Sequence, residues 1–173
     1  LPDADRVRAA IKACPLVVVS DVTAKSDTAK LADIFLPATG WGEKSGTVTN
    51  SERRISRQRS FLHPPGEARH DWWAICAVAR RMGFEGFDFD SPAAIYREYA
   101  SLSAFENEGM RDFDIGAHSG ISEEAYDGLL PYQWPKPLNE PAAGSVSGNN
   151  HRFFSDGQFY TDDRRARFIC TPF

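Results

Sequence analysis

Residues 16–21 read Leu-Val-Val-Val-Ser-Asp and residues 32–37 read Ala-Asp-Ile-Phe-Leu-Pro, and these two stretches decide the fold. The first is a short, continuous, β-branched run, which is typical of a strand buried on both faces of a parallel sheet. The second is also apolar and is closed by Pro37, so it predicts a second strand. The polar pair Ser20 and Asp21 ends the first strand.

Helical patterns alternate with these two strands. Residues 2–13 predict a helix, because Pro2 suits a first turn and the acidic Asp3 favours the N-terminal end. Residues 26–31 predict a short helix with Ser26 as its N-cap. Alternating helices and strands at this spacing predict an α/β fold with a partly parallel sheet and flanking helices.

The strongest helical pattern covers residues 71–82. Apolar side chains recur there every three or four residues, and we expect Trp72 and Ile75 to be buried against the sheet. Asp71 is the expected N-cap, and Gly83 is the expected end of the helix.

Together, these and the remaining sequence patterns divide the chain into three parts. An α/β domain covers residues 1–104, with a small hairpin at 47–57 and a last helix at 91–104 capped by Ser91. Gly, Pro, Asp and Asn then dominate, which predicts an irregular connector over 105–150 with a short helix at 122–130, mobile from 131 onward. Residues 151–173 alternate polar and apolar side chains, which predicts a β-hairpin-like segment.

Composition excludes several classes of protein. The chain has 173 residues and a net charge of −4, so it lacks the basic surplus that binds nucleic acid. A run of eighteen apolar residues is absent from the sequence, so we expect no membrane partner. Three widely spaced cysteines and four histidines have no metal-ligand spacing, so we predict no metal ligands and no catalytic residues. The chain begins at Leu1 without a methionine, and we expect it to be a piece of a longer protein.

Four residues near strand ends are candidates for ligand binding. Parallel sheets place ligands at the carboxyl ends of their strands, which is where Ser20 and Asp21 lie. The Asp21 carboxylate offers two acceptors in one plane, which suits a guanine edge, but a turn residue or helix N-cap is the interpretation that the spacing alone favours. Lys44, between Gly42 and Gly46, suits a phosphate, but a surface ion pair with a nearby glutamate is the simpler interpretation.

Two further groups of charged residues are ambiguous. The spacing alone makes Asp71 a helix cap. The four arginines at positions 53, 54, 57 and 59 suit a pyrophosphate or an acidic neighbouring domain, but a solvated strand face is the more common arrangement. Glycine-rich phosphate loops, Gly-x-Ser-x-Gly and His-Glu-x-x-His are absent from the sequence.

Four stretches in this order resemble the molybdopterin oxidoreductases. They are the two strand segments, residues 41–54 (Trp-Gly-Glu-Lys-Ser-Gly-Thr-Val-Thr-Asn-Ser-Glu-Arg-Arg) and residues 65–73 (Pro-Gly-Glu-Ala-Arg-His-Asp-Trp-Trp). Gly42 and the downstream segments at 105–116 and 154–157 resemble the assimilatory nitrate reductase branch of that family.

The resemblance implies a fold, a cofactor and a site. Residues 1–104 would be part of a third, Rossmann-like domain, and the last segment would lead to a missing C-terminal domain. The intact enzyme would hold molybdenum in a bis-molybdopterin guanine dinucleotide, hold an iron–sulfur cluster elsewhere, and reduce nitrate to nitrite. Matched by position, Ser20, Asp21, Lys44 and Asp71 would bind the guanosine or pyrophosphate part of the cofactor.

The resemblance also implies partners and leaves alternatives. The expected partners are the other domains of the same subunit and an electron-donor protein or subunit, in the cytoplasm. We expect the isolated chain to hold no cofactor and to be inactive. One alternative is the same domain of a formate dehydrogenase or another molybdopterin oxidoreductase. An alternative of a different class is a non-catalytic nucleotide-binding or interaction module.

Overall fold

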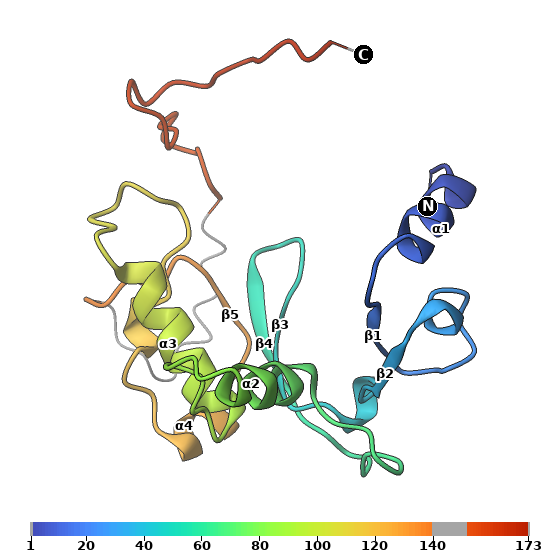
Figure 1. The fold of residues 1–173 in the computed structure, drawn as a ribbon. Coiled ribbons are helices and arrows are strands. Elements are labelled where there is room, and N and C mark those ends of the chain that lie inside the picture. Colours follow the sequence, from blue (N-terminus) through green and yellow to red (C-terminus); the bar gives the residue numbers. More distant parts are fainter. Residues whose placement is uncertain (1, 140–151, 173) are drawn as a thin grey trace. The chain divides into compact units, whose positions relative to one another are not determined.

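A computed structural model describes residues 2–139 and 152–172. The chain forms two compact units, one made of residues 1–45 and 58–90 and the other of residues 46–57 and 91–173 (Figure 1). The expected division at residue 104 differs from this grouping, because that position lies inside the second unit. Every helix in the described part of the chain is too short or too polar to cross a bilayer.

The first unit begins with the predicted helix, α1 (Ala4–Lys12), which Asp3 caps by accepting a hydrogen bond from the Arg6 N–H at 3.4 Å. Strand β1 (Val18–Asp21) follows, then the 3-10 turn η1 (Ala29–Leu31) and strand β2 (Ile34–Pro37). Ser26 Oγ accepts a hydrogen bond from the Ala29 N–H at 3.1 Å. The helix predicted over 26–31 is therefore wrong: a single 3-10 turn forms, its N-cap residue is Thr28, and Ser26 bonds to the first N–H of the turn.

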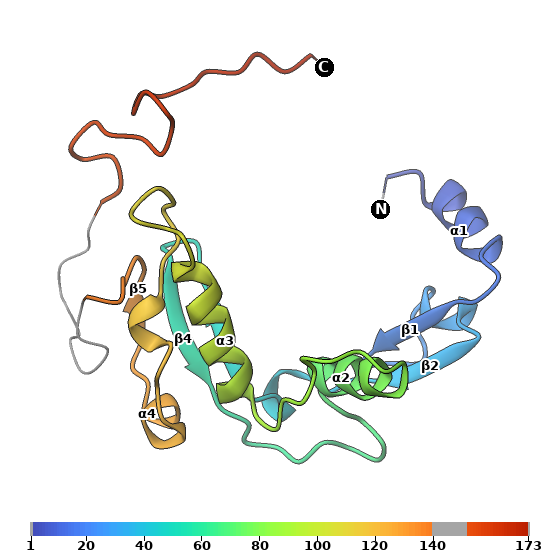
Figure 2. The same ribbon diagram turned by 60° about the vertical axis from the view of Figure 1, so that its left-hand side comes forward.

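Strands β1 and β2 pair in parallel, so the predicted α/β arrangement is confirmed (Figure 2). The segment that precedes α2 continues the parallel pattern, because Arg69 forms a bridge with Ala38 beside the end of β2. Burial of β1 on both faces is wrong, since Leu16 is 60% exposed and Val18 is 50% exposed. The reason is that β1 pairs only with β2 among the described residues, so it is an edge strand.

Helix α2 (Asp71–Arg81) confirms the predicted helix, and Gly83 ends it with a φ of +81°. Two details are wrong. His70 is the N-cap residue and Asp71 is the first helical residue. Ile75 is 60% exposed. The buried residues of the helix are instead the small Cys76, Ala77 and Ala79, whereas Val78 and Met82 are exposed like Ile75.

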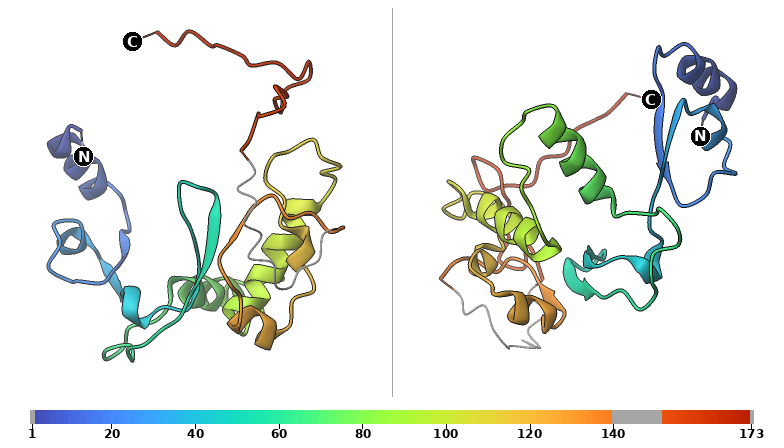
Figure 3. Two further views of the ribbon diagram at one scale, coloured as in Figure 1. Left: turned by 180° about the vertical axis from the view of Figure 1, so that it is seen from behind. Right: turned by 60° about the horizontal axis from the view of Figure 1, so that its bottom comes forward.

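The second unit contains a three-stranded sheet in the order β3-β4-β5. Strands β3 (Gly46–Thr49) and β4 (Arg54–Gln58) form the predicted hairpin (Figure 3), and β5 (Tyr132–Gln133) pairs antiparallel with β4. Helix α3 (Pro92–Ala104) is capped by Ser91 as predicted. The 3-10 turn η3 (Gly116–His118) and the short helix α4 (Glu123–Asp127) complete the unit.

The segment expected to be an irregular connector is packed as far as residue 139. It supplies most of the core of the second unit, which consists of Ile55, Ala93, Tyr96, Ala100, Ile115, Ile121, Tyr126, Leu129 and Tyr132. In place of the hydrogen bonds of helices and strands, side chains bond to the backbone of this segment. Asn107 Oδ1, for example, accepts a hydrogen bond from the Arg111 N–H at 2.7 Å. The short helix predicted at 122–130 is present as a helix over Glu123–Asp127 and the rest of the segment is largely irregular, but composition alone did not show that the segment packs as a core.

Two predictions concern the end of the chain. Residues 140–151 lie outside the described residues, so the expected mobility of that part stays a prediction. The hairpin expected near the C-terminus is wrong, because residues 152–172 contain turns and no strand. Paired turns, closed by a hydrogen bond from the Phe159 N–H to the Arg164 carbonyl at 3.0 Å, account for the alternating pattern.

Candidate functional site

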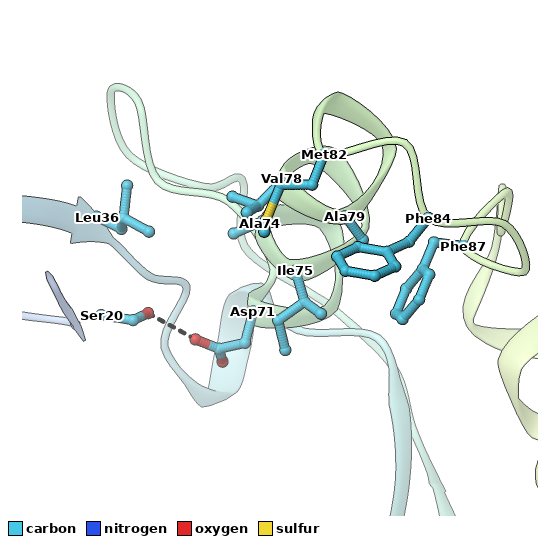
Figure 4. A pocket seen from close by; sticks show the side chains of 10 residues that line it. All are labelled: Ser20, Leu36, Asp71, Ala74, Ile75, Val78, Ala79, Met82, Phe84 and Phe87. Atoms are coloured by element: carbon cyan, nitrogen blue, oxygen red, sulfur yellow. Dashed lines mark hydrogen bonds between the residues drawn. The ribbon is translucent and has the colours of Figure 1, made fainter.

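Three of the four predicted site residues meet in the first unit. Ser20 Oγ donates a hydrogen bond to Asp71 Oδ1 at 2.8 Å (Figure 4). Lys44 Nζ donates to Asp71 Oδ2 at 3.2 Å. Both oxygens of one carboxylate are therefore engaged by partners far apart in the sequence. We call Ser20, Lys44 and Asp71 the carboxylate cluster.

Local structure explains why these residues converge. Ser20 lies one residue before the carboxyl end of β1, and Asp71 is the first residue of α2. Lys44 follows the 3-10 turn η2 (Trp41–Glu43), whose start is closed by a hydrogen bond from the Gly40 N–H to the Glu43 carboxylate at 2.8 Å. The cluster thus lies where the chain leaves parallel strands, which is the place that α/β folds use for ligands.

The cluster holds its carboxylate in the ionised form. The pKa of Asp71 is lowered, and the largest cause is the hydrogen bond from Ser20. Burial is the next largest effect and raises the pKa, while the hydrogen bond and the charge of Lys44 lower it further. The Lys44 and Asp71 side chains are 36% and 50% exposed. An ionised acceptor and an ammonium group are therefore both accessible to a ligand from solvent.

Asp21 does not belong to the carboxylate cluster. Its carboxylate accepts hydrogen bonds from the Thr23 N–H at 3.3 Å and from Ser26 Oγ at 2.7 Å. These bonds lower the pKa of Asp21, with the bond from Ser26 as the largest cause. The turn role weighed for Asp21 is therefore present, although a carboxylate with about four lone-pair positions keeps acceptor capacity beyond these two bonds.

An apolar pocket of about 470 Å³ borders the cluster in the same unit (Figure 4). Ser20 and Asp71 provide its polar groups, and Leu36 of β2 lies close to them. The rest of the lining comes from α2 and the segment after it: Ala74, Ile75, Val78, Ala79, Met82, Phe84 and Phe87. Ile75, which the helical pattern assigned to the core, is thus part of the pocket lining.

Two arginines of the basic run are engaged inside the second unit. The Arg57 side chain is only 6% exposed, its guanidinium lies 4.4 Å from the Tyr126 ring centre, and it donates to Asp127 at 2.9 Å. Arg53 donates to the Trp134 carbonyl at 2.6 Å, and its guanidinium lies 3.6 Å from the Phe153 ring centre. The solvated strand face favoured by the sequence is therefore wrong for these two residues.

The sequence reasoning missed Thr39 and His70. Thr39 follows β2 and is fully buried, and its Oγ1 lies 3.2 Å from His70 Nδ1, at hydrogen-bond distance. Thr39 is part of no quoted motif, and the available signal for His70 was that it precedes Asp71 within the family-like stretch at 65–73. Among the residues that the structure describes, no three His, Cys, Asp or Glu side chains form a group that would hold a metal ion.

The chain is similar to known enzymes. Residues 1–81 match the family model for molybdopterin oxidoreductase. A nitrate reductase of Klebsiella oxytoca is 53% identical over 88% of this chain, and one of Shewanella frigidimarina is 46% identical over 99% of it. The alpha subunit of an F420-dependent formate dehydrogenase of Methanocaldococcus jannaschii is 42% identical over 98% of the chain.

These relatives are much longer than the chain. It spans 18% of the length of each of the two nitrate reductases and 25% of the formate dehydrogenase subunit. The family model covers α1, both parallel strands, the carboxylate cluster and α2. The chain therefore belongs to the molybdopterin oxidoreductase family.

Proposed function

We propose that this chain is part of the catalytic subunit of a molybdenum-dependent assimilatory nitrate reductase, where it helps bind a molybdopterin guanine dinucleotide. The observation that carries the proposal is the carboxylate cluster at the carboxyl edge of the parallel strands. Similarity supports nitrate as the substrate, because the two nitrate reductases are 53% and 46% identical, against 42% for the formate dehydrogenase subunit.

The residues present fit a guanine dinucleotide by their chemistry. Asp71 offers an ionised carboxylate that accepts hydrogen bonds from a guanine edge or from ribose hydroxyls, and Lys44 offers a cation for phosphate. Ser20 fixes the carboxylate, and Asp21 adds acceptor capacity at the next position of the strand. When bound, the cofactor supplies the two-electron redox chemistry that converts nitrate to nitrite, while these residues bind and orient it.

The proposal includes the rest of the enzyme. The other domains of the subunit would carry a second guanine dinucleotide, the molybdenum ligand and an iron–sulfur cluster, and a separate protein or subunit would donate electrons in the cytoplasm. Formate oxidation is the second candidate function, supported by the formate dehydrogenase relative. Assays of the full-length protein with nitrate and reduced viologen dye, and with formate and oxidised dye, distinguish the two activities.

The binding role is tested by substitution in the full-length protein. We expect Asp71→Ala and Lys44→Ala each to lower guanine nucleotide content per subunit about tenfold, because a hydrogen bond to a charged group contributes about 1.5–3 kcal/mol. Asp21→Ala is expected to lower it less, since Asp21 is engaged by Thr23 and Ser26.

The control is a matched pair of charges in the same unit. Lys30 and Asp27 also lie 3.2 Å apart, but their side chains are 61% and 80% exposed and they lie outside the cluster. Lys30→Ala and Asp27→Ala should leave nucleotide content unchanged. If substitutions in the two pairs change nucleotide content by the same amount, the carboxylate cluster has no binding role.

A further inference from the structure

We propose that Thr39 and His70 are positioning residues for Asp71, and that the hydrogen bond between the buried Thr39 side chain and His70 fixes the start of α2 so that the Asp71 carboxylate faces the cofactor. This inference rests on the proposed binding role of Asp71. It adds two residues whose side chains bond to each other and not to the carboxylate cluster.

The backbone brings the two residues side by side. The Arg69 N–H donates to the Pro37 carbonyl at 3.0 Å, and the Thr39 N–H donates to the Arg69 carbonyl at 3.1 Å. The segment before α2 therefore runs beside the end of β2 as a short parallel ladder. Ala38 and Ala68 are both buried, and their small side chains allow the two segments to approach closely.

The start of α2 has no side-chain cap, and besides the bond between Thr39 and His70 its described side-chain bonds are those of the Asp71 carboxylate itself. His70 occupies the N-cap position, but its side chain makes no capping hydrogen bond to the helix. Its carbonyl accepts the first hydrogen bond of the helix, from the Trp73 N–H at 3.0 Å. A rotation at residue 70 would therefore move the whole first turn, and Asp71 is the first residue of that turn.

The bond between Thr39 Oγ1 and His70 Nδ1 restricts this rotation. The two atoms lie 3.2 Å apart, and Thr39 is fully buried, so water is not a ready substitute for His70 at the Thr39 hydroxyl. The imidazole ring also stacks on Trp72, with ring centres 6.1 Å apart and planes 9° apart. His70 thus contacts the segment after β2 through Thr39 and contacts α2 through Trp72.

The test is nucleotide content of the full-length protein, compared between single and double variants. Thr39→Val keeps the shape and removes the hydroxyl, and it should lower nucleotide content about threefold to tenfold. Thr39→Ser restores a hydroxyl and should restore the content. His70→Phe keeps a flat ring that can stack on Trp72 but lacks Nδ1, so it should behave like Thr39→Val.

A positioning role predicts dependence on Asp71. In the Asp71→Ala background, Thr39→Val should cause no further loss, because the group that it positions is absent. An equal loss in both backgrounds would mean that Thr39 only stabilises the fold, and would overturn the inference. Ser103→Ala is the control: it removes another buried hydroxyl, in the second unit, and should not change nucleotide content.

The outcomes separate the two proposals. If Asp71→Ala leaves nucleotide content unchanged, the proposed binding role is wrong. If Asp71→Ala lowers it while Thr39→Val and His70→Phe do not, the binding role stands and the positioning inference is wrong.

Discussion

Two carboxylates near the end of β1 are each held by one serine hydroxyl. Asp71 accepts a hydrogen bond from Ser20 at 2.8 Å, and Asp21 accepts one from Ser26 at 2.7 Å. In both cases this bond is the largest cause of a lowered pKa. The two sites are close in the fold but use separate partners, so each can be changed without the other.

We therefore expect a reciprocal pattern of pKa changes at the scale of single residues. Ser20→Ala should raise the pKa of Asp71 toward its ordinary value and leave that of Asp21 unchanged, whereas Ser26→Ala should do the reverse. Carboxyl ¹³C chemical shifts followed against pH give both values. A change in both residues on either substitution would contradict the separation of the two sites.

The sign of the linked stability follows from the direction of the shift. Because the pKa of Asp71 is lower in the folded protein, the bonds from Ser20 and Lys44 stabilise the unit above the unfolded-state pKa of about 3.9. That stabilisation is lost as the pH falls through the lowered folded-state value. In the Ser20→Ala variant we expect the acid loss of structure around α2 to begin at a higher pH.

At the scale of elements, the packing of α3 against η3 depends on Gly116. A Cβ atom added at Gly116 would lie 2.7 Å from Ala104 Cβ and 3.0 Å from Asp114 Oδ1. Gly120, four residues later, has no atom within 4 Å of an added Cβ. The two glycines therefore form a matched pair, one tightly packed and one in open space.

We expect Gly116→Ala to lower the stability of the second unit by about 1–3 kcal/mol, because overpacking forces neighbouring atoms apart. Gly120→Ala should change it by less than about 0.5 kcal/mol. Amide hydrogen exchange of α3 measures both effects. Equal exchange rates in the two variants would show that η3 moves away from α3 at no cost.

At the scale of the whole molecule, we expect the metal chemistry of the proposed enzyme to belong to other parts of the full-length protein. The residues that the structure describes contain no group of three metal-ligating side chains, and the three cysteines are free. We expect the isolated 173-residue chain to purify with no stoichiometric molybdenum or iron and to show no nitrate reduction with reduced viologen dye. Elemental analysis and the dye assay test this, and metal at one atom per chain would contradict it.

Local patterns in the sequence were sufficient for several single elements in both units. The β-branched run at 16–19, the cap at Ser91 and the helix end at Gly83 all act over a few residues, and the structure confirms a strand, a cap and a helix end there. The hairpin around Asn50 is local in the same sense. Predictions of burial were wrong where they depended on distant parts of the chain covering an apolar face. Strand β1 is an edge strand, and Ile75 faces a pocket instead of a core.

By itself, the sequence determined the α/β order of elements, the family resemblance and four candidate site residues. Only the tertiary structure decided that Ser20, Lys44 and Asp71 share one carboxylate, while Asp21 bonds within its own turn. It also decided that residues 105–139 pack as a core and that Arg57 is buried. The physical reason is that these contacts join residues up to 70 positions apart, and no local spacing specifies which distant partner completes a hydrogen bond or covers an apolar face.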